Sequence, residues 1–405
     1  MTLIVQKYGG TSVADLPRIQ RVAARIARTR REGHDVVAVV SAMAGETNRL
    51  VALGNAAFPN HAEREHDVLL TTGEQVTAAL TAIALEADGV PAQSYLGFQV
   101  PIVTDQAHGR ARITRIEGDA LRATLACGRV AVVAGFQGIA ADGSVTTLGR
   151  GGSDTTAVAL AAALGADTCE IYTDVDGVFT SDPRIVPGAH KLERIAHDEM
   201  LELAGLGARV LHIRSVAFAK RYGVPLHVRS SFHDGEGTWV VKEEASMEEV
   251  MVAGVACDSN QAKLTLERVP DRPGVAAKVF GPIAASGIVV DMIIQNASAE
   301  GLTDLTFTVP QSDYERARAV VEKLRADVGG GEVRADVDVA KVSIVGLGMR
   351  THAGIAARMF EVLAAEGINV QMISTSEIKI SVVIAAKYAE LAVRALHDAL
   401  VDGTA

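Results

Sequence analysis

The sequence is poor in cysteine and has no long apolar segment. Its three cysteines, Cys127, Cys169 and Cys257, form no CxxC pair. Neither a disulfide framework nor a zinc site is therefore expected. The longest run of small apolar residues, at 157–164, is much shorter than the roughly 20 residues that span a bilayer. We expect a cytoplasmic protein with reduced thiols and no membrane association.

Positive charge is also in deficit. The chain has 39 Lys and Arg against 49 Asp and Glu, a net charge of −10. This balance disfavours nucleic acids as partners, and an anionic substrate must find a locally basic pocket. The 405 residues, of which 48% are hydrophobic, are too many for one ordinary core, so two or three domains are expected.

The usual nucleotide-binding motifs are missing as well. The sequence contains no GxxxxGK[ST] loop, no GxGxxG, and no HRD and DFG pair. It does contain three glycine-containing loops, each placed directly after a predicted strand. Loops of this kind leave backbone N–H groups free near a helix N-terminus, where anions bind favourably.

Apolar strands alternate with helical segments over residues 1–245. Asp15 and Pro17 are typical of a helix start, and Ser153 or Asp154 is expected to cap an alanine-rich helix that ends at Gly165. The alternation predicts an α/β domain with a mainly parallel sheet. Its predicted strands lie at 3–8, 36–40, 130–134, 171–173 and, as the last one, 226–229.

The C-terminal part of the chain contains an internal repeat. GVAAKVF at 274–280 matches GIAARMF at 354–360, and GIVVDMI at 287–293 matches GINVQMI at 367–373. Each copy combines strands and two helices in the order βαββαβ or a close variant, which is typical of a ferredoxin-like unit. We expect these units at 262–335 and 340–405, after a charged linker at 243–250.

The first loop places Lys7 at the end of a strand, before Gly9 and Gly10, where a lysine can reach a phosphate. A tight turn beside a solvated lysine is the alternative. The second loop sets Arg150 among three glycines, and arginine is suited to a bidentate hold on a carboxylate. Ordinary turn glycines followed by a helix cap are the alternative there.

The third loop, TDVDGVFTSDPR at 173–184, has acids that suit ribose or metal and an arginine that suits phosphate. A calcium loop is disfavoured because its twelfth position is Ile185 rather than glutamate, while a plain cluster of turns stays open. Ser41 and Thr47 supply hydroxyls after the second strand. Glu74 is expected near a helix start, where the helix dipole alone would favour it.

Six motifs then occur in one order: KYGGTS, VVSAMAGETN, LLTTGEQ, GFQG, GRGGSDTTA and TDVDGVFTSDPR. VPDRPGVAAKVF, DMIIQN and ISTSEIKISV follow. The set resembles the amino-acid kinase family, its aspartate kinase branch in particular, with paired C-terminal ACT domains. The resemblance covers nearly the whole chain and implies an open αβα sandwich followed by two ferredoxin-like ACT domains. It also implies ATP- and Mg²⁺-dependent phosphorylation of the β-carboxylate of L-aspartate to 4-phospho-L-aspartate, in lysine, threonine and methionine biosynthesis.

The same resemblance implies roles for individual residues. Lys7 would bridge the phosphates and Asp154 would orient the lysines, as the two catalytic residues. The substrate-binding set would be Ser41, Thr47, Glu74, Arg150, Gly151, Gly152, Ser153 and Asp154. The nucleotide-binding set would be Lys7, Gly9, Gly10, Thr173, Asp174, Phe179, Thr180, Asp182, Pro183, Arg184 and Arg209. No residue is assigned to the metal ion.

The sequence departs from the family near its GAKVLHPR motif. GARVLHIR stands there, so Arg209 replaces the usual lysine and Ile213 the usual proline. Arginine keeps the charge but changes the donor geometry. Another amino-acid or carbamate kinase and a catalytically inactive amino-acid sensor are the rival interpretations. Retention of Lys7 and Asp154 disfavours the sensor.

The ACT repeat predicts feedback regulation by threonine, lysine or both. A turn that enters a helix can bind the carboxylate of an amino acid, and an aspartate there can bind its ammonium. The predicted effector residues are Asp271, Gly274, Val275, Ala276, Gln295 and Asn296. ACT modules also expose faces that pair between chains, so a homodimer or larger assembly is expected. An internal start at Met247 or Met251, giving a separate regulatory subunit, is an alternative to ordinary internal methionines.

Overall fold

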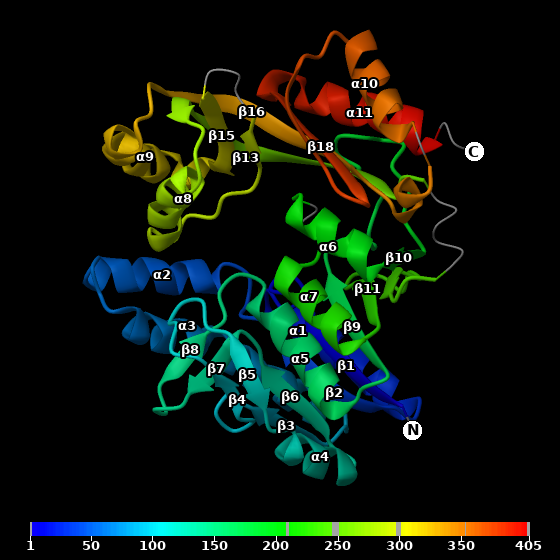
Figure 1. The fold of residues 1–405 in the computed structure, drawn as a ribbon. Helices are drawn as coiled ribbons and strands as arrows, with labels where there is room; N and C mark the ends of the chain where they lie inside the picture. The colour runs from blue at the N-terminus through cyan, green and yellow to red at the C-terminus, as the bar shows by residue number, and fades with distance from the viewer. Residues whose placement is uncertain (1, 208–209, 245–250, 297–300, 353, 403–405) are drawn as a thin grey trace. The chain divides into compact units, whose positions relative to one another are not determined.

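The computed structural model describes residues 2–207, 210–244, 251–296, 301–352 and 354–402 (Figure 1). The chain forms two compact units. The first contains most of the described chain up to residue 244, and the second contains the C-terminal part together with residues 180–189 and 206–207. Each unit is described by itself.

An eight-stranded sheet forms the centre of the first unit, in the order β10-β12-β11-β9-β1-β2-β6-β3. The neighbours from β11 to β3 are all parallel, as predicted, because their strands are buried apolar runs joined by helical crossovers. The strands are β1 Leu3–Tyr8, β2 Asp35–Val40, β3 Ala92–Tyr95, β6 Val130–Ala134, β9 Thr168–Thr173, β10 Arg194–Ala196, β11 Leu226–Ser230 and β12 Thr238–Val241.

The expectation that the strand at 226–229 is the last one of this sheet is wrong. β12 follows it and pairs antiparallel with β11. β12 has few residues and polar neighbours, so its apolar alternation was too short to predict a strand. A smaller sheet, ordered β5-β4-β7-β8, lies in the same unit. Its strands are β4 Ile102–Thr104, β5 Ile113–Ile116, β7 Gln137–Ala140 and β8 Val145–Thr147.

Helices cover the large sheet. α1 and α3 pack against each other and share a core with β1, β2 and β6 that includes Tyr8, Ile19 and Leu85. α5 packs on β1 and β9 and contacts α7. The helices are α1 Leu16–Arg31, α2 Glu46–Ala57, α3 Glu63–Ala87, α4 Asp119–Ala126, α5 Gly152–Leu164, α6 His197–Gly205 and α7 Ile213–Tyr222.

The predicted start of α1 is confirmed, since the Asp15 carboxylate accepts a hydrogen bond from the Arg18 N–H. The predicted cap of α5 is wrong. Gly151 is the cap residue, in a left-handed conformation with φ 66°, and neither Ser153 nor Asp154 caps the helix. A Cβ at Gly151 would lie 2.2 Å from Cβ of His212, so only glycine fits this turn.

The expectation that Glu74 lies near a helix start is also wrong. α3 begins at Glu63 and continues through Thr71–Thr72–Gly73, so Glu74 lies in its interior. A Cβ at Gly73 would come within 2.8 Å of the Ala42 Cβ, so glycine lets the helix approach the end of β2 closely. Among the described residues, α3 is long and apolar enough to cross a membrane, but half of its apolar window is buried in this unit.

The second unit contains a six-stranded antiparallel sheet in the order β14-β15-β13-β16-β18-β17. Its strands are β13 Gly254–Pro270, β14 Ile293–Gln295, β15 Leu302–Pro310, β16 Val333–Val345, β17 Val370–Thr375 and β18 Lys379–Ala385. Its helices are α8 Val275–Ala285, α9 Tyr314–Val328, α10 Ile355–Ala365 and α11 Ala389–Leu400. α8 packs with α9 and α10 with α11, each pair over its own apolar core.

The two ferredoxin-like modules share their longest strands. The C-terminal half of β13 and the N-terminal half of β16 pair within the first module, at 263–266 and 333–336. Residues 254–258 of β13 pair instead with 341–345 of β16 and supply the fourth strand of the second module. The first module is thus inserted into the second, which the repeat alone did not indicate.

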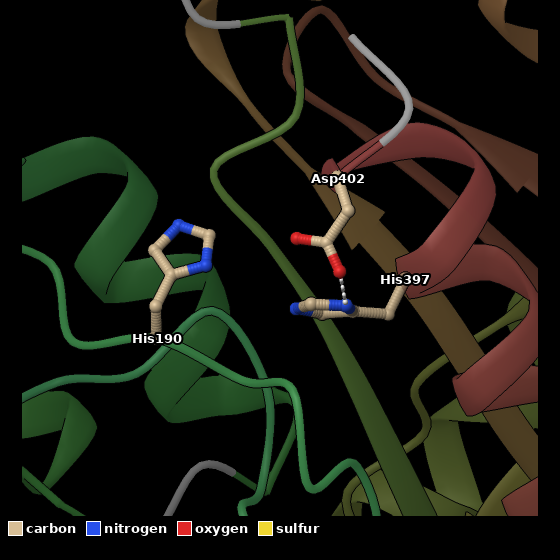
Figure 2. Close-up of side chains that lie close together, drawn as sticks. All are labelled: His190, His397 and Asp402. Carbon is tan, nitrogen blue, oxygen red and sulfur yellow. Dashed lines mark ion pairs between the residues drawn. The ribbon is translucent and has the colours of Figure 1, made fainter. Parts of the chain in front are cut away.

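Residues 180–189 belong to the second unit, and part of this segment packs in the core of the second module. Val186 is buried in the cluster that contains Val255, and the Val255 N–H donates to the Thr180 carbonyl at 2.8 Å. The Thr180 hydroxyl lies 2.8 Å from Nε2 of His397, whose ring is fully buried. Nδ1 of His397 forms an ion pair with Asp402 at 3.3 Å (Figure 2).

Candidate functional site

A cavity of about 710 Å³ opens in the first unit, beside the C-terminal ends of β1 and β2. Ligands of open α/β sheets bind at this edge, where loops leave the strands. The cavity unites residues from β1, the β2–α2 loop, α3 and the loop that enters α5. Of the predicted residues, Lys7, Gly9, Gly10, Ser41, Thr47, Glu74, Arg150, Gly151, Gly152, Ser153 and Asp154 line it.

Lys7 and Asp154 form the centre of this cavity. The ammonium of Lys7 lies 2.5 Å from Oδ1 of Asp154, and the two side chains are only 11% and 13% exposed. Asp154 is in the first turn of α5, where the helix dipole favours a negative charge. The carboxylate therefore fixes the lysine ammonium beside the N-terminus of α5, and together they form a site for an anion.

Glu74 is a buried carboxylate whose hydrogen bonding is incomplete. Its Oε1 accepts from the Ala42 N–H at 3.0 Å, whereas Oε2, also buried, accepts no hydrogen bond in the described part of the chain. Burial raises the pKa of Glu74 from 4.5 to about 7, and the hydrogen bond from Ala42 opposes this shift. A buried carboxylate of this kind is stabilised by a cationic group in the cavity.

Arg150 lies on the exposed rim of the cavity, between Gly149 and Gly151. It forms no ion pair with any residue that the structure describes, so its guanidinium remains available to a carboxylate. The cavity therefore offers an anionic group at Glu74 and cationic groups at Arg150 and Lys7. This distribution suits a ligand with one ammonium and more than one anionic group.

The hydroxyl residues Ser41 and Thr47 lie at the turn after β2. The Ser41 N–H donates to the Tyr8 carbonyl at 3.1 Å, which ties this turn to the end of β1. Gly45 then adopts φ 83° and precedes α2, placing Thr47 in the first turn of that helix. Both residues line the cavity, on the side of Glu74.

Sequence reasoning missed Asp67, which has the most hydrogen bonds of any carboxylate near the cavity. It is fully buried in α3, two turns before Glu74. Its oxygens accept from Nδ1 of His108 at 2.9 Å, from the Gly109 N–H at 3.1 Å and from the Thr147 hydroxyl at 2.5 Å. Gly109 and Thr147 line the cavity, so Asp67 holds two parts of its wall. The seven-residue spacing from Glu74 was the one available sequence signal.

Other wall residues were missed as well, among them Glu63, His66 and Phe136. Glu63 and His66 line the cavity from the first turn of α3, and Nδ1 of His66 lies 2.6 Å from Nε2 of His61. Phe136, within the GFQG motif, has a left-handed backbone with φ 69°. Its ring would lie 2.7 Å from a Cβ at Gly152, so the unusual conformation brings the ring against the glycine loop.

The third loop is not part of this cavity. Thr173 ends β9, and its hydroxyl lies 3.2 Å from Oδ1 of the exposed Asp174. Phe179 forms a β-bridge with Lys191 in the same unit. The predicted nucleotide roles of these residues stay predictions.

The remaining nucleotide candidates fall in the second unit or outside the described residues. The carboxylate of Asp182 accepts from Nε of Arg184 at 3.0 Å, and this hydrogen bond raises the arginine pKa. Pro183 lies between them and is exposed. Arg209 lies outside the described residues, as does Met247.

The predicted effector residues lie in the first ACT-like module. Gly274 is the cap of α8, with φ 91°, and no side chain caps this helix. The alternative that Asp271 merely caps the helix therefore does not hold, and its N–H donates to the Gly301 carbonyl at 2.8 Å. Val275 and Ala276 begin α8. Gln295 ends β14 and, with Asn296, is exposed.

Comparisons with known proteins agree with this architecture. The amino acid kinase family profile matches residues 2–230, and ACT domain profiles match 264–329 and 342–400. The aspartokinase of Pseudomonas aeruginosa is 57% identical over 98% of this chain and 97% of its own length. The aspartate kinase of Pseudomonas putida is 58% identical over the same shares.

Solved structures give the same result. The structure of E. coli aspartokinase III in complex with aspartate and ADP is 29% identical, with a TM-score of 0.83 over 98% of this chain and 100% of that one. The complex of the same enzyme with lysine and aspartate superposes with a TM-score of 0.78 over 98% and 99% of the two chains.

Proposed function

The chain belongs to the amino acid kinase family, as an aspartate kinase with two ACT domains, and from that premise we propose that it phosphorylates the β-carboxylate of L-aspartate, giving 4-phospho-L-aspartate. The observation that supports this choice of substrate is the buried carboxylate of Glu74, which has one oxygen without a hydrogen-bond partner among the described residues. It lines one cavity with Arg150 and with the Lys7–Asp154 pair. An α-amino dicarboxylate matches these charges group by group.

The chemistry needs no general base. The β-carboxylate of aspartate has an ordinary pKa of about 3.9, so it is already an anion at neutral pH. What the site must supply is positioning of the two reactants and neutralisation of charge on the transferred phosphoryl group. A histidine-based dyad is therefore unnecessary.

Each cavity residue has a role in this scheme. Oε2 of Glu74 accepts a hydrogen bond from the ammonium of aspartate. Arg150, at the rim of the cavity, binds a carboxylate of the substrate. Ser41 and Thr47 donate hydroxyls to the substrate, and the N–H groups of the glycine loop face its charge. Lys7 neutralises the phosphoryl oxygens, while Asp154 orients its ammonium.

ATP is the phosphoryl donor, and the nucleotide contacts are proposed from the third loop and Arg209. Magnesium, when bound, would lower the negative charge of the phosphates. The carboxylate nearest Lys7 is Asp154, which is paired to that lysine. These residues fit a magnesium ion whose ligands would come mainly from the phosphates and from water. Asp154 would then serve to orient Lys7.

The first experiment measures ADP release with aspartate, glutamate and N-acetylglutamate as acceptors. Aspartate is expected to be preferred over N-acetylglutamate, because an acetylated amine cannot pair with Glu74. Lys7→Ala should lower kcat by about three powers of ten and change the KM for aspartate far less. Preference for N-acetylglutamate would favour the acetylglutamate kinase alternative, and a Lys7→Ala variant with near-normal kcat would remove Lys7 from the mechanism.

Arg150 provides an independent test of substrate binding. Arg150→Ala should raise the KM for aspartate strongly and leave the KM for ATP nearly unchanged, since it loses one charge-assisted pair to a carboxylate. Arg129, which is exposed and lines no part of the cavity, provides the control, as Arg129→Ala. A rise confined to the KM for ATP would place Arg150 at the nucleotide instead.

The ACT modules are proposed to bind threonine, lysine or both as feedback inhibitors. Support comes from the start of α8 after Asp271, which no side chain caps, and from E. coli aspartokinase III, whose structure was solved in complex with lysine and aspartate. Residues 180–189 offer a covalent route to the catalytic unit, because they belong to the second unit, with Val186 in its core, and the chain enters and leaves them from the first unit. We also propose that the enzyme acts in the cytoplasm, in a pathway that forms lysine and threonine, and that it forms a homodimer or a larger assembly.

The regulatory proposal is tested by activity against effector concentration. Asp271→Ala should increase the threonine or lysine concentration for half inhibition at least tenfold, about 1.4 kcal/mol, with uninhibited kcat little changed. Asp313→Ala, in the same module but away from this turn, is the control. Equal curves for the Asp271 variant and the unmodified enzyme would move the effector site elsewhere.

A further inference from the structure

A second pocket lies in the first unit, behind the glycine loop of the cavity. Its volume is about 300 Å³, and three arginines, Arg112, Arg214 and Arg221, contribute to its lining. Arg112 and Arg221 are exposed, whereas Arg214 is half-buried. Thr155 of α5 and Phe218 of α7 form other parts of the wall.

The arginines of this pocket lack anionic partners. None of the three forms an ion pair with a residue in the described ranges. Asp105 is the carboxylate that acts on Arg214, and its Oδ1 already accepts from the N–H groups of Ala107 and Arg112. Burial lowers the pKa of Arg214, and the charge of Arg112 lowers it further. Like charges brought together in this way favour a bound anion.

Arg214 also connects this pocket to the wall of the cavity. Its guanidinium donates to the Leu148 carbonyl and, at 2.9 Å, to the Ala111 carbonyl. Leu148 directly precedes Gly149 and Arg150, and Ala111 lies two residues after Gly109. The Thr155 hydroxyl donates to the Gly151 carbonyl at 3.0 Å. Two pocket residues thus hold the backbone whose other side lines the substrate cavity.

We propose that the pocket formed by Arg112, Arg214 and Arg221 binds a small multivalent anion, a phosphorylated metabolite or a polycarboxylate, and that this binding changes the affinity of the cavity for aspartate. Planar guanidinium groups bind phosphate and carboxylate oxygens in pairs, and the pocket has room for a ligand of this size. The bound anion engages Arg214, which then redistributes its hydrogen bonds to Leu148 and Ala111. The effect on aspartate rests on the proposed function, whereas the binding itself does not.

The binding test uses calorimetry on the full chain, with pyrophosphate and citrate as separate probes. All proteins carry Lys7→Ala, to weaken phosphate binding in the main cavity. Arg112→Ala with Arg221→Ala should weaken binding of at least one probe tenfold or more. Arg21→Ala with Arg129→Ala removes the same charge from two exposed arginines outside the pocket, and should leave the affinity within about twofold. The probe that binds more tightly identifies the ligand class.

Hydrogen exchange locates the probe. Protection is expected in peptides covering 109–116 and 213–222, and it should disappear in the Arg112/Arg221 variant. The proposed site would be wrong if the Arg112/Arg221 variant bound the probes as tightly as its parent protein. It would also be wrong if the Arg21/Arg129 control lost as much affinity as the Arg112/Arg221 variant. The coupling is measured separately, as the aspartate KM at saturating ATP with and without the probe. A probe that binds but shifts the KM equally in the unmodified enzyme and in the Arg112/Arg221 variant would overturn the coupling and retain the site.

Discussion

Two buried carboxylates on one face of α3, Asp67 and Glu74, have opposite surroundings. Asp67 accepts hydrogen bonds from His108, Gly109 and Thr147, so its charge is compensated within the protein. Glu74 accepts one from Ala42 and leaves its second oxygen without a partner in the described chain. The pKa of Glu74 rises to about 7 as a result of burial.

The difference distinguishes a carboxylate that supports the wall of the cavity, Asp67, from a carboxylate that is proposed to bind the ligand, Glu74. A carboxylate whose oxygens are all bonded stabilises the fold and fixes its neighbours. A buried carboxylate with a free oxygen weakens the unliganded fold and becomes stabilised when a cation arrives. The predictions below remove one feature of this contrast at a time, from the largest expected effect to the smallest.

The largest effect concerns the stability of the unliganded protein. The folded-state pKa of Glu74 is raised from 4.5 to about 7, so the folded state binds more protons than the unfolded state between these pH values. Stability should therefore fall as pH rises through this window and then stay level. Glu74→Gln lacks this loss and should be more stable than the unmodified protein by up to about 3 kcal/mol at pH 8. Urea unfolding of both proteins at pH 4.5 and pH 8 measures this difference in the free energy of unfolding. If the difference is the same at both pH values, the charge of Glu74 does not destabilise the fold.

The next effect concerns the affinity for aspartate. Glu74→Gln should raise the KM for aspartate roughly a hundredfold, because a charge-assisted hydrogen bond to the ammonium contributes about 2–3 kcal/mol. The KM for ATP should change little. Steady-state kinetics at saturating ATP measure the aspartate KM. An unchanged value would show that Glu74 does not bind the ammonium of aspartate.

The pH profile sharpens the same assignment. Because Glu74 must ionise before it pairs with an ammonium, the aspartate KM of the unmodified enzyme should rise about tenfold between pH 8 and pH 6, given a pKa of about 7. Glu74→Gln should show a flat profile over this range. If the variant keeps the dependence, the titrating group is not Glu74.

The smallest kinetic effect is expected at Asp67. Asp67→Asn replaces an acceptor by an amide that cannot accept from both His108 and Thr147, so the fold should lose about 1–3 kcal/mol. The cavity wall at Gly109 should loosen, raising the aspartate KM by about threefold to fivefold, with a pH profile like that of the unmodified enzyme. A KM effect as large as that of Glu74→Gln would mean that Asp67 contacts the substrate itself.

Eleven of the 23 residues that line the cavity could be predicted from the sequence, because they occur in short motifs. Lys7 lies near the end of β1 and Ser41 directly follows β2, and parallel strands bring their C-terminal ends to one edge. Arg150 lies in the glycine loop between β8 and α5, which its three glycines mark in the sequence. Asp67 could not be predicted in this way. Its partners His108 and Thr147 are separated from it by 41 and 80 positions, and no local pattern links them.

By itself the sequence determined the alternation of strands and helices, the internal repeat and four charged residues of the cavity, Lys7, Glu74, Arg150 and Asp154. These follow from local periodicity and from short turns, which act over a few residues. Tertiary structure alone decided that Glu74 lies inside a helix with a buried free oxygen, and that residues 254–258 complete the second ACT module. Burial and strand pairing depend on neighbours far away in the chain, so neither is encoded in any one segment.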